Sequence, residues 1–194
     1  MLLIVTAFPG HAGRCWSLAR WRSLARSLAL ARSHPQHGAP LTDIYDPAEL
    51  AALEARIDDW LASIATGASL PIESIERAEG DVRRWYIRLR GEDKDFTTVW
   101  LTIGQRTLRY ETYVMPAPEE NAAELYEHLL RRNERLVGAH FSIGIEDAVF
   151  LRGELPLGAL SESELDRVLG TLYATVEQVF QGLLRIGFAS RFAT

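Results

Sequence analysis

The stretch VRRWYIRLRGEDKDFTTVWLTIGQRTLRYETYVM, residues 82–115, decides the fold. It holds three runs in which apolar and polar residues alternate, at 82–90, 96–103 and 107–115. Such alternation is typical of half-buried β-strands. Short polar turns join the runs, so the stretch predicts consecutive antiparallel strands.

The register of these strands follows if both turns are tight. Tyr86 then pairs with Trp100, Trp100 with Glu111, and Thr98 with Tyr113. Because the apolar residues of all three strands fall on the same face, the pattern predicts a three-stranded antiparallel meander.

A helix signal precedes the meander. Asp46, Pro47 and Glu49 predict an N-cap, a proline in the first turn and a capping box, and apolar residues then recur at helical spacing as far as Gly67. We interpret residues 68–80 as a connection with room for a short strand near 72–75.

A helix, a hairpin and a further helix follow the meander. The pattern predicts a helix over 119–138, strands over 139–145 and 148–155, and a helix that begins at the capping box Ser161–Glu164. The order is therefore α-β-β-β-α-β-β-α. It predicts an α+β domain, with an antiparallel sheet of about five strands and helices packed on it.

Charge divides the chain into two parts. Residues 1–40 contain five arginines and no acid, and because the whole chain carries -5, the remaining 154 residues carry -10. This asymmetry predicts a basic leader, residues 1–41, and a domain, residues 42–194. We expect the leader to be disordered or to result from a start codon placed too early. A basic amphipathic helix over 16–32 that contacts a membrane or nucleic acid is the alternative.

Composition excludes several classes of protein. With 47% hydrophobic and 24% charged residues, the chain has the composition of a folded globular domain. The single cysteine, Cys15, excludes a disulfide framework and a thiolate zinc cluster. The apolar run 2–8 precedes the positive charges, which is the reverse of a secretory signal, and it is too short to span a bilayer. We therefore expect a cytoplasmic protein with no membrane partner.

Motifs for catalysis and cofactor binding are missing from the sequence. No glycine-rich phosphate loop, His-Glu-x-x-His or Cys-x-x-Cys motif occurs, so we expect no cofactor and no metal. Glu124 and His128 lie four residues apart on a predicted helix, but they supply two ligands at most. The run 140–144 around Ser142 lacks the first glycine of a nucleophile elbow. A metal-dependent or hydrolytic enzyme that uses His128 and His140 is therefore only the alternative to a binding function.

The polar face of the meander is the candidate site. In the predicted register this face gathers the candidate residues Arg84, Tyr86, Arg88, Trp100, Arg109 and Tyr113, together with Glu111. Arginine and aromatic residues are enriched at protein interfaces, and also on sheets that bind single-stranded RNA. The net charge of the domain disfavours nucleic acid, so protein binding is the leading interpretation. A purely structural sheet, covered by another element, is the alternative.

Four segments carry a resemblance to a known family. They are DFTTVW (95–100), TLRYETYV (107–114), YEHLLRRN (126–133) and FSIG (141–144). Together with the order of elements, they make residues 45–192 resemble the actinobacterial branch of the YbjN family, which is similar in fold to type III secretion chaperones. The resemblance implies a cytoplasmic, non-enzymatic domain that forms homodimers. It also implies a role as a regulator of sensory transduction or as a chaperone-like binder of a client protein.

Overall fold

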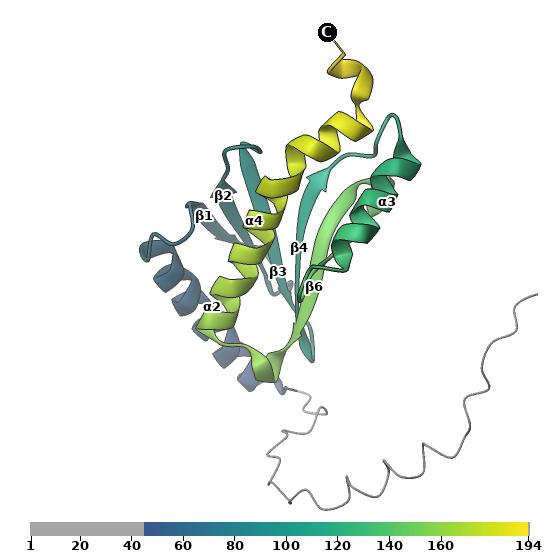
Figure 1. Ribbon diagram of the computed structural model, residues 1–194. Coiled ribbons are helices and arrows are strands. Elements are labelled where there is room, and N and C mark those ends of the chain that lie inside the picture. Colours follow the sequence, from purple (N-terminus) through teal and green to yellow (C-terminus); the bar gives the residue numbers. More distant parts are fainter. Residues whose placement is uncertain (1–44, 194) are drawn as a thin grey trace, which may run out of the picture. The chain divides into compact units, whose positions relative to one another are not determined.

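A computed structural model describes residues 45–193 of the chain. These residues form an antiparallel β-sheet with α-helices packed on it (Figure 1), so the predicted α+β class is confirmed. The predicted leader, residues 1–41, lies outside the described residues, and so does the alternative helix over 16–32.

The described elements follow one another as a helix, four strands, a helix, two strands and a long helix. In chain order they are α2 (Pro47–Thr66), β1 (Ile72–Arg77), β2 (Arg84–Arg90), β3 (Phe96–Ile103), β4 (Thr107–Met115), α3 (Ala122–Asn133), β5 (His140–Ile143), β6 (Val149–Pro156) and α4 (Glu162–Gly187). Short 3-10 turns flank β6 at Ile145–Asp147 and Leu157–Ala159, and another follows α4 at Ala189–Arg191.

The sheet has the strand order β1-β2-β3-β4-β6-β5, and every neighbouring pair is antiparallel. Both predicted partners of Trp100 are confirmed, Tyr86 on β2 and Glu111 on β4. Pairing between β3 and β4 ends at Val99 and Thr112, so it stops one position before the predicted pair of Thr98 with Tyr113. The meander that the sequence predicts is therefore the centre of the sheet.

The sheet has six strands, one more than the predicted five. The additional strand is β1, which extends the short strand placed near 72–75 to Arg77 and pairs along β2. A register shift between Ile72 and Ser74 interrupts the pairing of β1 with β2. An irregularity of this kind breaks strict alternation, which explains why the sequence pattern is weak there.

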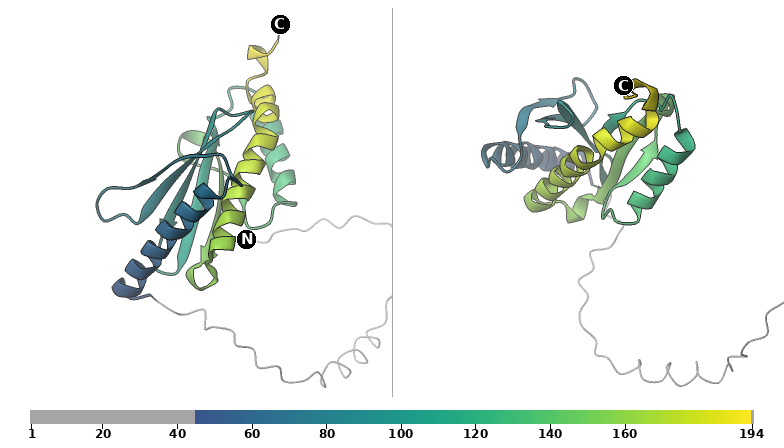
Figure 2. Two further views of the ribbon diagram at one scale, coloured as in Figure 1. Left: turned by 90° about the vertical axis from the view of Figure 1, so that its left-hand side faces the viewer. Right: turned by 45° about the horizontal axis from the view of Figure 1, so that its top comes forward.

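The three helices lie on one face of the sheet, which we call the core face (Figures 1 and 2). Alternate strand residues are fully enclosed there, including Trp85, Ile87 and Leu101. The Trp85 indole Nε1 donates a 2.6 Å hydrogen bond to Asp58 Oδ1 of α2, which ties that helix to β2. The opposite face, which we call the open face, has none of the described helices over it.

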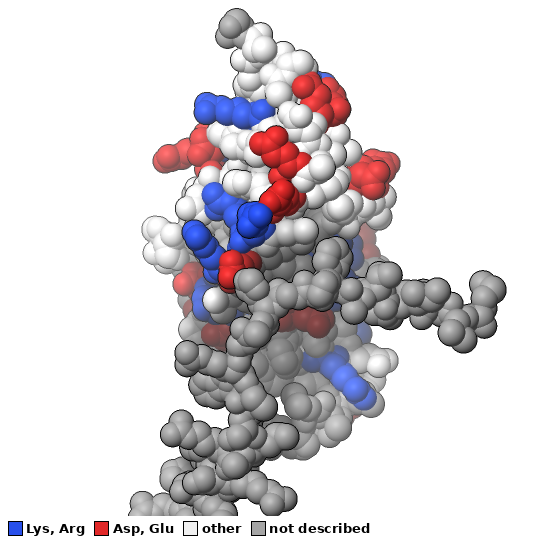
Figure 3. All heavy atoms as spheres, turned by 45° about the vertical axis from the view of Figure 1, so that its right-hand side comes forward, with Lys and Arg blue, Asp and Glu red and all other residues white. Residues whose placement is uncertain are grey.

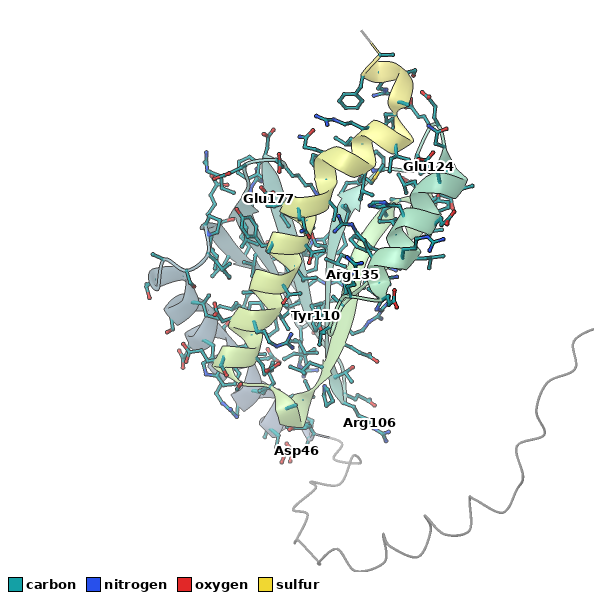
Figure 4. The ribbon with its side chains drawn as sticks, in the orientation of Figure 1. Asp46, Arg106, Tyr110, Glu124, Arg135 and Glu177 are labelled. Atoms are coloured by element: carbon teal, nitrogen blue, oxygen red, sulfur yellow. The ribbon has the colours of Figure 1, made fainter. Side chains whose placement is uncertain are left out.

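The helix caps explain where two helices begin. Asp46 accepts hydrogen bonds from the main-chain N–H groups of Ala48 and Glu49, and the Glu49 side chain accepts one from Asp46, so the predicted capping box is confirmed (Figure 4). At the last helix, the Ser161 hydroxyl accepts a hydrogen bond from the Glu164 N–H.

The middle helix, Ala122–Asn133, is shorter at both ends than the predicted 119–138. The main-chain N–H groups of Glu119 and Glu120 both donate to the carbonyl of Gly187, at the end of α4. Asn121 then adopts a left-handed conformation with φ of 50°. The left-handed conformation of Asn121 interrupts the helical backbone, so the helix begins at Ala122 and the prediction of a start at 119 was wrong.

The end of α3 is fixed by one asparagine. Asn133 accepts a hydrogen bond from the Phe141 N–H and donates one to its carbonyl, at 2.7 and 3.2 Å. Both main-chain groups of Phe141 on β5, an edge strand of the sheet, are therefore satisfied by the Asn133 side chain. Satisfied groups cannot pair with another strand, so the end of α3 protects this edge at Phe141.

Candidate functional site

The open face contains all six residues that the sequence analysis singled out. Because successive residues of a strand point to opposite faces, β2 contributes Arg84, Tyr86 and Arg88, β3 contributes Trp100, and β4 contributes Arg109 and Tyr113. The strand register places Tyr86 beside Trp100, and it places Arg84 and Arg109 on either side of Thr102. The structure therefore brings these residues onto one face, as the register predicted.

An aromatic cluster lies at the centre of the open face. The ring of Phe150, from β6, lies 6.2 Å from that of Trp100 and packs edge-on against Tyr113, with ring centroids 5.7 Å apart. The Arg152 guanidinium lies over the same ring, 4.4 Å from its centroid. With these neighbours Phe150 is only 8% exposed, whereas Tyr113 is 37% exposed. The cluster thus exposes aromatic surface that is supported by the nearly buried Phe150 ring.

A second aromatic residue anchors the arginines of β2. The guanidinium of Arg88 lies 3.8 Å from the Phe96 ring centroid and that of Arg90 lies 5.5 Å from it. Both arginines also pair with Glu73, at 3.2 and 2.7 Å. The Glu73 carboxylate therefore pairs with both guanidinium groups, and both of these groups stack on the Phe96 ring.

Arg84 and Arg109 are less engaged than the other arginines of this face. The Arg84 Nε donates a 2.9 Å hydrogen bond to the Thr102 hydroxyl. Among residues 45–193 neither Arg84 nor Arg109 forms an ion pair, whereas Arg152 lies 2.8 Å from a Glu111 carboxylate oxygen. Glu154 is the cross-strand neighbour of Arg109 on β6, but no ion pair forms between them, so both arginines retain N–H groups that a bound carboxylate can reach.

The β2–β3 turn is held beside the site by α4. The Glu177 carboxylate accepts hydrogen bonds from the main-chain N–H groups of Glu92, Asp93 and Lys94 (Figure 4). A Cβ at Gly91 would collide with the main-chain carbonyl of Lys94 as well as with the same carboxylate, so the turn requires glycine there. This arrangement fixes the end of the hairpin that carries most of the candidate residues.

Lys94, the single lysine of the chain, extends from that turn to the end of β4. Its ammonium donates a hydrogen bond to the main-chain carbonyl of Tyr113, and lies 5.2 Å from the Tyr113 ring centroid and 5.6 Å from that of Phe180. Burial lowers the pKa of Lys94 to about 8, against the opposing effect of Glu177. Burial also raises the pKa of Tyr113, and nearby Glu146 raises it further.

Sequence reasoning missed Phe96, Phe150 and Arg152. The sequence pattern could have identified Phe96, because Phe96 and Trp100 are an even number of positions apart on β3 and so lie on the same face. Phe150 and Arg152 belong to β6, which pairs with β4 across the intervening helix. No local pattern predicts that long-range pairing, so only the structure could add these two residues.

The histidines of the alternative enzyme lie on two different elements. His128 lies on α3 with its Nε2 3.2 Å from the Arg132 Nε, and His140 lies exposed at the start of β5. Ser142 lies within β5, and a strand-to-strand turn follows it, whereas a nucleophile elbow leads from a strand into a helix. Within residues 45–193 no three His, Cys, Asp or Glu side chains are grouped as metal ligands.

The side of the domain on which α3 lies is different in character. Acidic and basic side chains are interspersed there with uncharged surface (Figure 3). Nor does any helix among the described residues combine the length and apolar character needed to cross a membrane. On the open face, by contrast, arginines lie beside the aromatic rings of Phe96 and Phe150.

Comparison with known proteins assigns the chain to a family. The sequence profile of the YbjN family, described as "Putative bacterial sensory transduction regulator", matches residues 58–185. The chain belongs to the YbjN family. The match includes all six strands, so the open face is part of the YbjN domain.

Mycobacterial proteins are similar to this YbjN chain in sequence. Rv0487 of Mycobacterium tuberculosis is 36% identical over 104 residues, which are 54% of this chain and 57% of that protein. ML2442 of Mycobacterium leprae is 35% identical over 107 residues, which are 55% of this chain and 58% of that protein. The chain thus spans little more than half the length of these relatives.

Solved structures with similarity to the YbjN domain include a type III secretion chaperone. The ExsC–ExsE complex has a TM-score of 0.48 and 20% identity, and the match covers 68% of this chain and 96% of the solved one. The Yersinia pestis chaperone SycH, in complex with a fragment of YscM2, has a TM-score of 0.41 and 22% identity, covering 61% and 94%.

Proposed function

We propose that this YbjN-family protein is a non-enzymatic, cytoplasmic module that binds and regulates other proteins and acts as a homodimer. Its partner or dimer surface is the open face, centred on Tyr86, Trp100 and Tyr113 with Arg84, Arg88 and Arg109 around them. The observation that carries the proposal is the cluster of accessible aromatic side chains on a face that none of the described helices covers.

The composition of the open face supports this proposal. Binding energy at protein interfaces is concentrated in a few tryptophan, tyrosine and arginine residues that lie on well-packed supports. Trp100 and Tyr113 both pack on the nearly buried Phe150, and Arg88 stacks on Phe96. Side chains held in this way lose little freedom on binding. The description of the family as a regulator agrees with a role exerted through protein contacts.

The test replaces the aromatic surface and leaves the fold in place. The variants are Trp100→Ser and Tyr113→Ser, each in the full chain. The matched control is Leu130→Ser with Val137→Ser, which removes apolar side chains that are 69% and 79% exposed but lie outside the open face. Circular dichroism confirms folding before association is measured.

We expect light scattering to show dimerisation weakened at least tenfold, or pull-down to show loss of partner capture, in the aromatic variants only. Unchanged association and unchanged capture in both would overturn the proposal. Metal analysis of the purified protein separates it from the enzyme alternative, because a stoichiometric metal would favour catalysis. A purely structural domain would show neither self-association nor partner capture in any variant.

A further inference from the structure

The charge of the open face differs from that of the rest of the domain. Residues 45–193 contain 25 acidic and 16 basic residues, a net charge of -9. Five of the basic residues are open-face arginines, whereas four glutamates lie on or reach this face. The arginines are Arg84, Arg88, Arg90, Arg109 and Arg152, and the glutamates are Glu73, Glu76, Glu111 and Glu154. Lys94 and Glu146, which both lie near Tyr113, offset each other. The face therefore carries +1, and an acidic partner meets less repulsion there than elsewhere on the domain.

Two cations on this face have a defined spacing. Arg84 and Arg109 face Thr102 from the strands on either side of it. Neighbouring strands lie about 4.8 Å apart, so the two arginines are roughly 10 Å apart at the backbone. An extended chain advances about 3.3 Å per residue, so side chains three residues apart span the same distance.

An apolar anchor point lies in the next row of the sheet. Tyr86 and Trp100 are directly paired there, and Trp100 rests against Phe150. A leucine or phenylalanine of a bound segment can pack on these rings while neighbouring carboxylates reach the two arginines. Apolar contact then supplies affinity and the paired charges supply selectivity.

We infer that the open face binds an acidic, extended polypeptide segment, whose carboxylates contact Arg84 and Arg109 and whose apolar side chain packs on Trp100. This inference rests on the proposed function and names the chemistry of the partner. A second copy of the chain fits less well, because two identical faces would bring arginines against arginines. A nucleic acid fits less well because a long polyanion would extend beyond this face onto the acidic remainder of the domain.

The test measures binding of three fluorescein-labelled peptides to the full chain by anisotropy in 50 mM salt. The first is SELSEFSELSEG, which has glutamates at every third position, and the other two carry glutamine or lysine in place of glutamate. A labelled uridine 12-mer is the fourth probe. Low salt is chosen because the Debye length is then above 10 Å and charge selectivity is retained.

We expect the glutamate peptide to bind at least tenfold more tightly than the glutamine peptide, and the lysine peptide to bind most weakly. The double variant Arg84→Glu, Arg109→Glu should reverse the order of the glutamate and lysine peptides. The matched control, Arg135→Glu with Arg185→Glu, changes two exposed arginines outside the open face and should keep the original order. Trp100→Ser should weaken all three peptides, because the apolar anchor is common to them.

Equal binding of the glutamate and glutamine peptides, or no binding of the glutamate peptide, would overturn this inference. So would tighter binding of the uridine 12-mer, which would make nucleic acid the partner. The proposed function survives the first two results if Trp100→Ser still abolishes association or partner capture. It fails separately if Trp100→Ser and Tyr113→Ser change neither of these.

Discussion

The Lys94 ammonium donates a hydrogen bond to the main-chain carbonyl of Tyr113, and so connects the β2–β3 turn to the last part of β4. The Phe180 ring of α4 lies 5.6 Å from the same ammonium. The single lysine of the chain therefore joins three elements beside the open face. Its partly buried charge has a measurable effect on stability.

Replacing Lys94 with methionine should remove a pH dependence of stability. Burial lowers the pKa of Lys94 from 10.5 in the unfolded chain to about 8 in the folded protein. Between these values the unfolded chain binds more protons, so the free energy of unfolding rises with pH. The stabilising contribution is complete above the unfolded value and is lost as pH falls through about 8. Urea unfolding of the wild type and Lys94→Met between pH 7 and 9.5 measures it.

The wild type should gain stability relative to Lys94→Met across this range. The tyrosines with raised pKa, Tyr110, Tyr113 and Tyr173, titrate above pH 10 and do not interfere. Parallel curves for the two proteins would show that the Lys94 charge is as well solvated in the folded state as in the unfolded one.

Local patterns predicted the central part of the fold. Alternation within residues 82–115 is strict, so the bounds of β3 and β4 and the partners of Trp100 followed from the sequence. The start of α3 did not, because Asn121 adopts a left-handed conformation and its side chain donates a hydrogen bond to the carbonyl of Ile186, which lies far away in sequence. Such long-range contacts override local helix signals.

Removing the Asp58 carboxylate should destabilise the domain. Trp85 is fully buried and its indole N–H donates to Asp58, so Asp58→Ala leaves a buried donor without an acceptor. We expect the free energy of unfolding to fall by about 1–3 kcal/mol. Asp58→Asn retains an acceptor, so its free energy of unfolding should fall by less. Asp59 is an exposed neighbour, and Asp59→Ala should change the free energy of unfolding by less than about 0.5 kcal/mol. Urea denaturation gives all three values, and equal losses at positions 58 and 59 would contradict the role of this bond.

Replacing a buried hydroxyl by a methyl group should stabilise the domain. Thr112 is fully buried in the core, and within the described part of the chain its hydroxyl has no hydrogen-bond partner. Thr112→Val removes this unsatisfied group with little change of shape, so we expect a gain of about 1 kcal/mol. Thr102→Val is the control, because the Thr102 hydroxyl accepts a bond from Arg84 and its loss should bring no gain. A lower melting temperature for Thr112→Val would show that the hydroxyl is satisfied.

The candidate site was predictable only in part. Alternation placed Trp100 and Tyr113 on one face, since side-chain direction in a strand follows from parity alone. Their support by Phe150 was not predictable, because it depends on β6 lying beside β4. The sharing of Glu73 by Arg88 and Arg90 likewise depends on β1, the strand with the weakest pattern.

The central claim is that a protein partner contacts the open face. Photo-crosslinking in the native cell tests it most directly, with benzoylphenylalanine in place of Tyr86 on the open face. A second probe replaces Arg135, which follows α3 away from that face (Figure 4). We predict light-dependent crosslinks to protein from position 86 and none from position 135. Crosslinks from position 135 alone, or from neither position, would contradict the account.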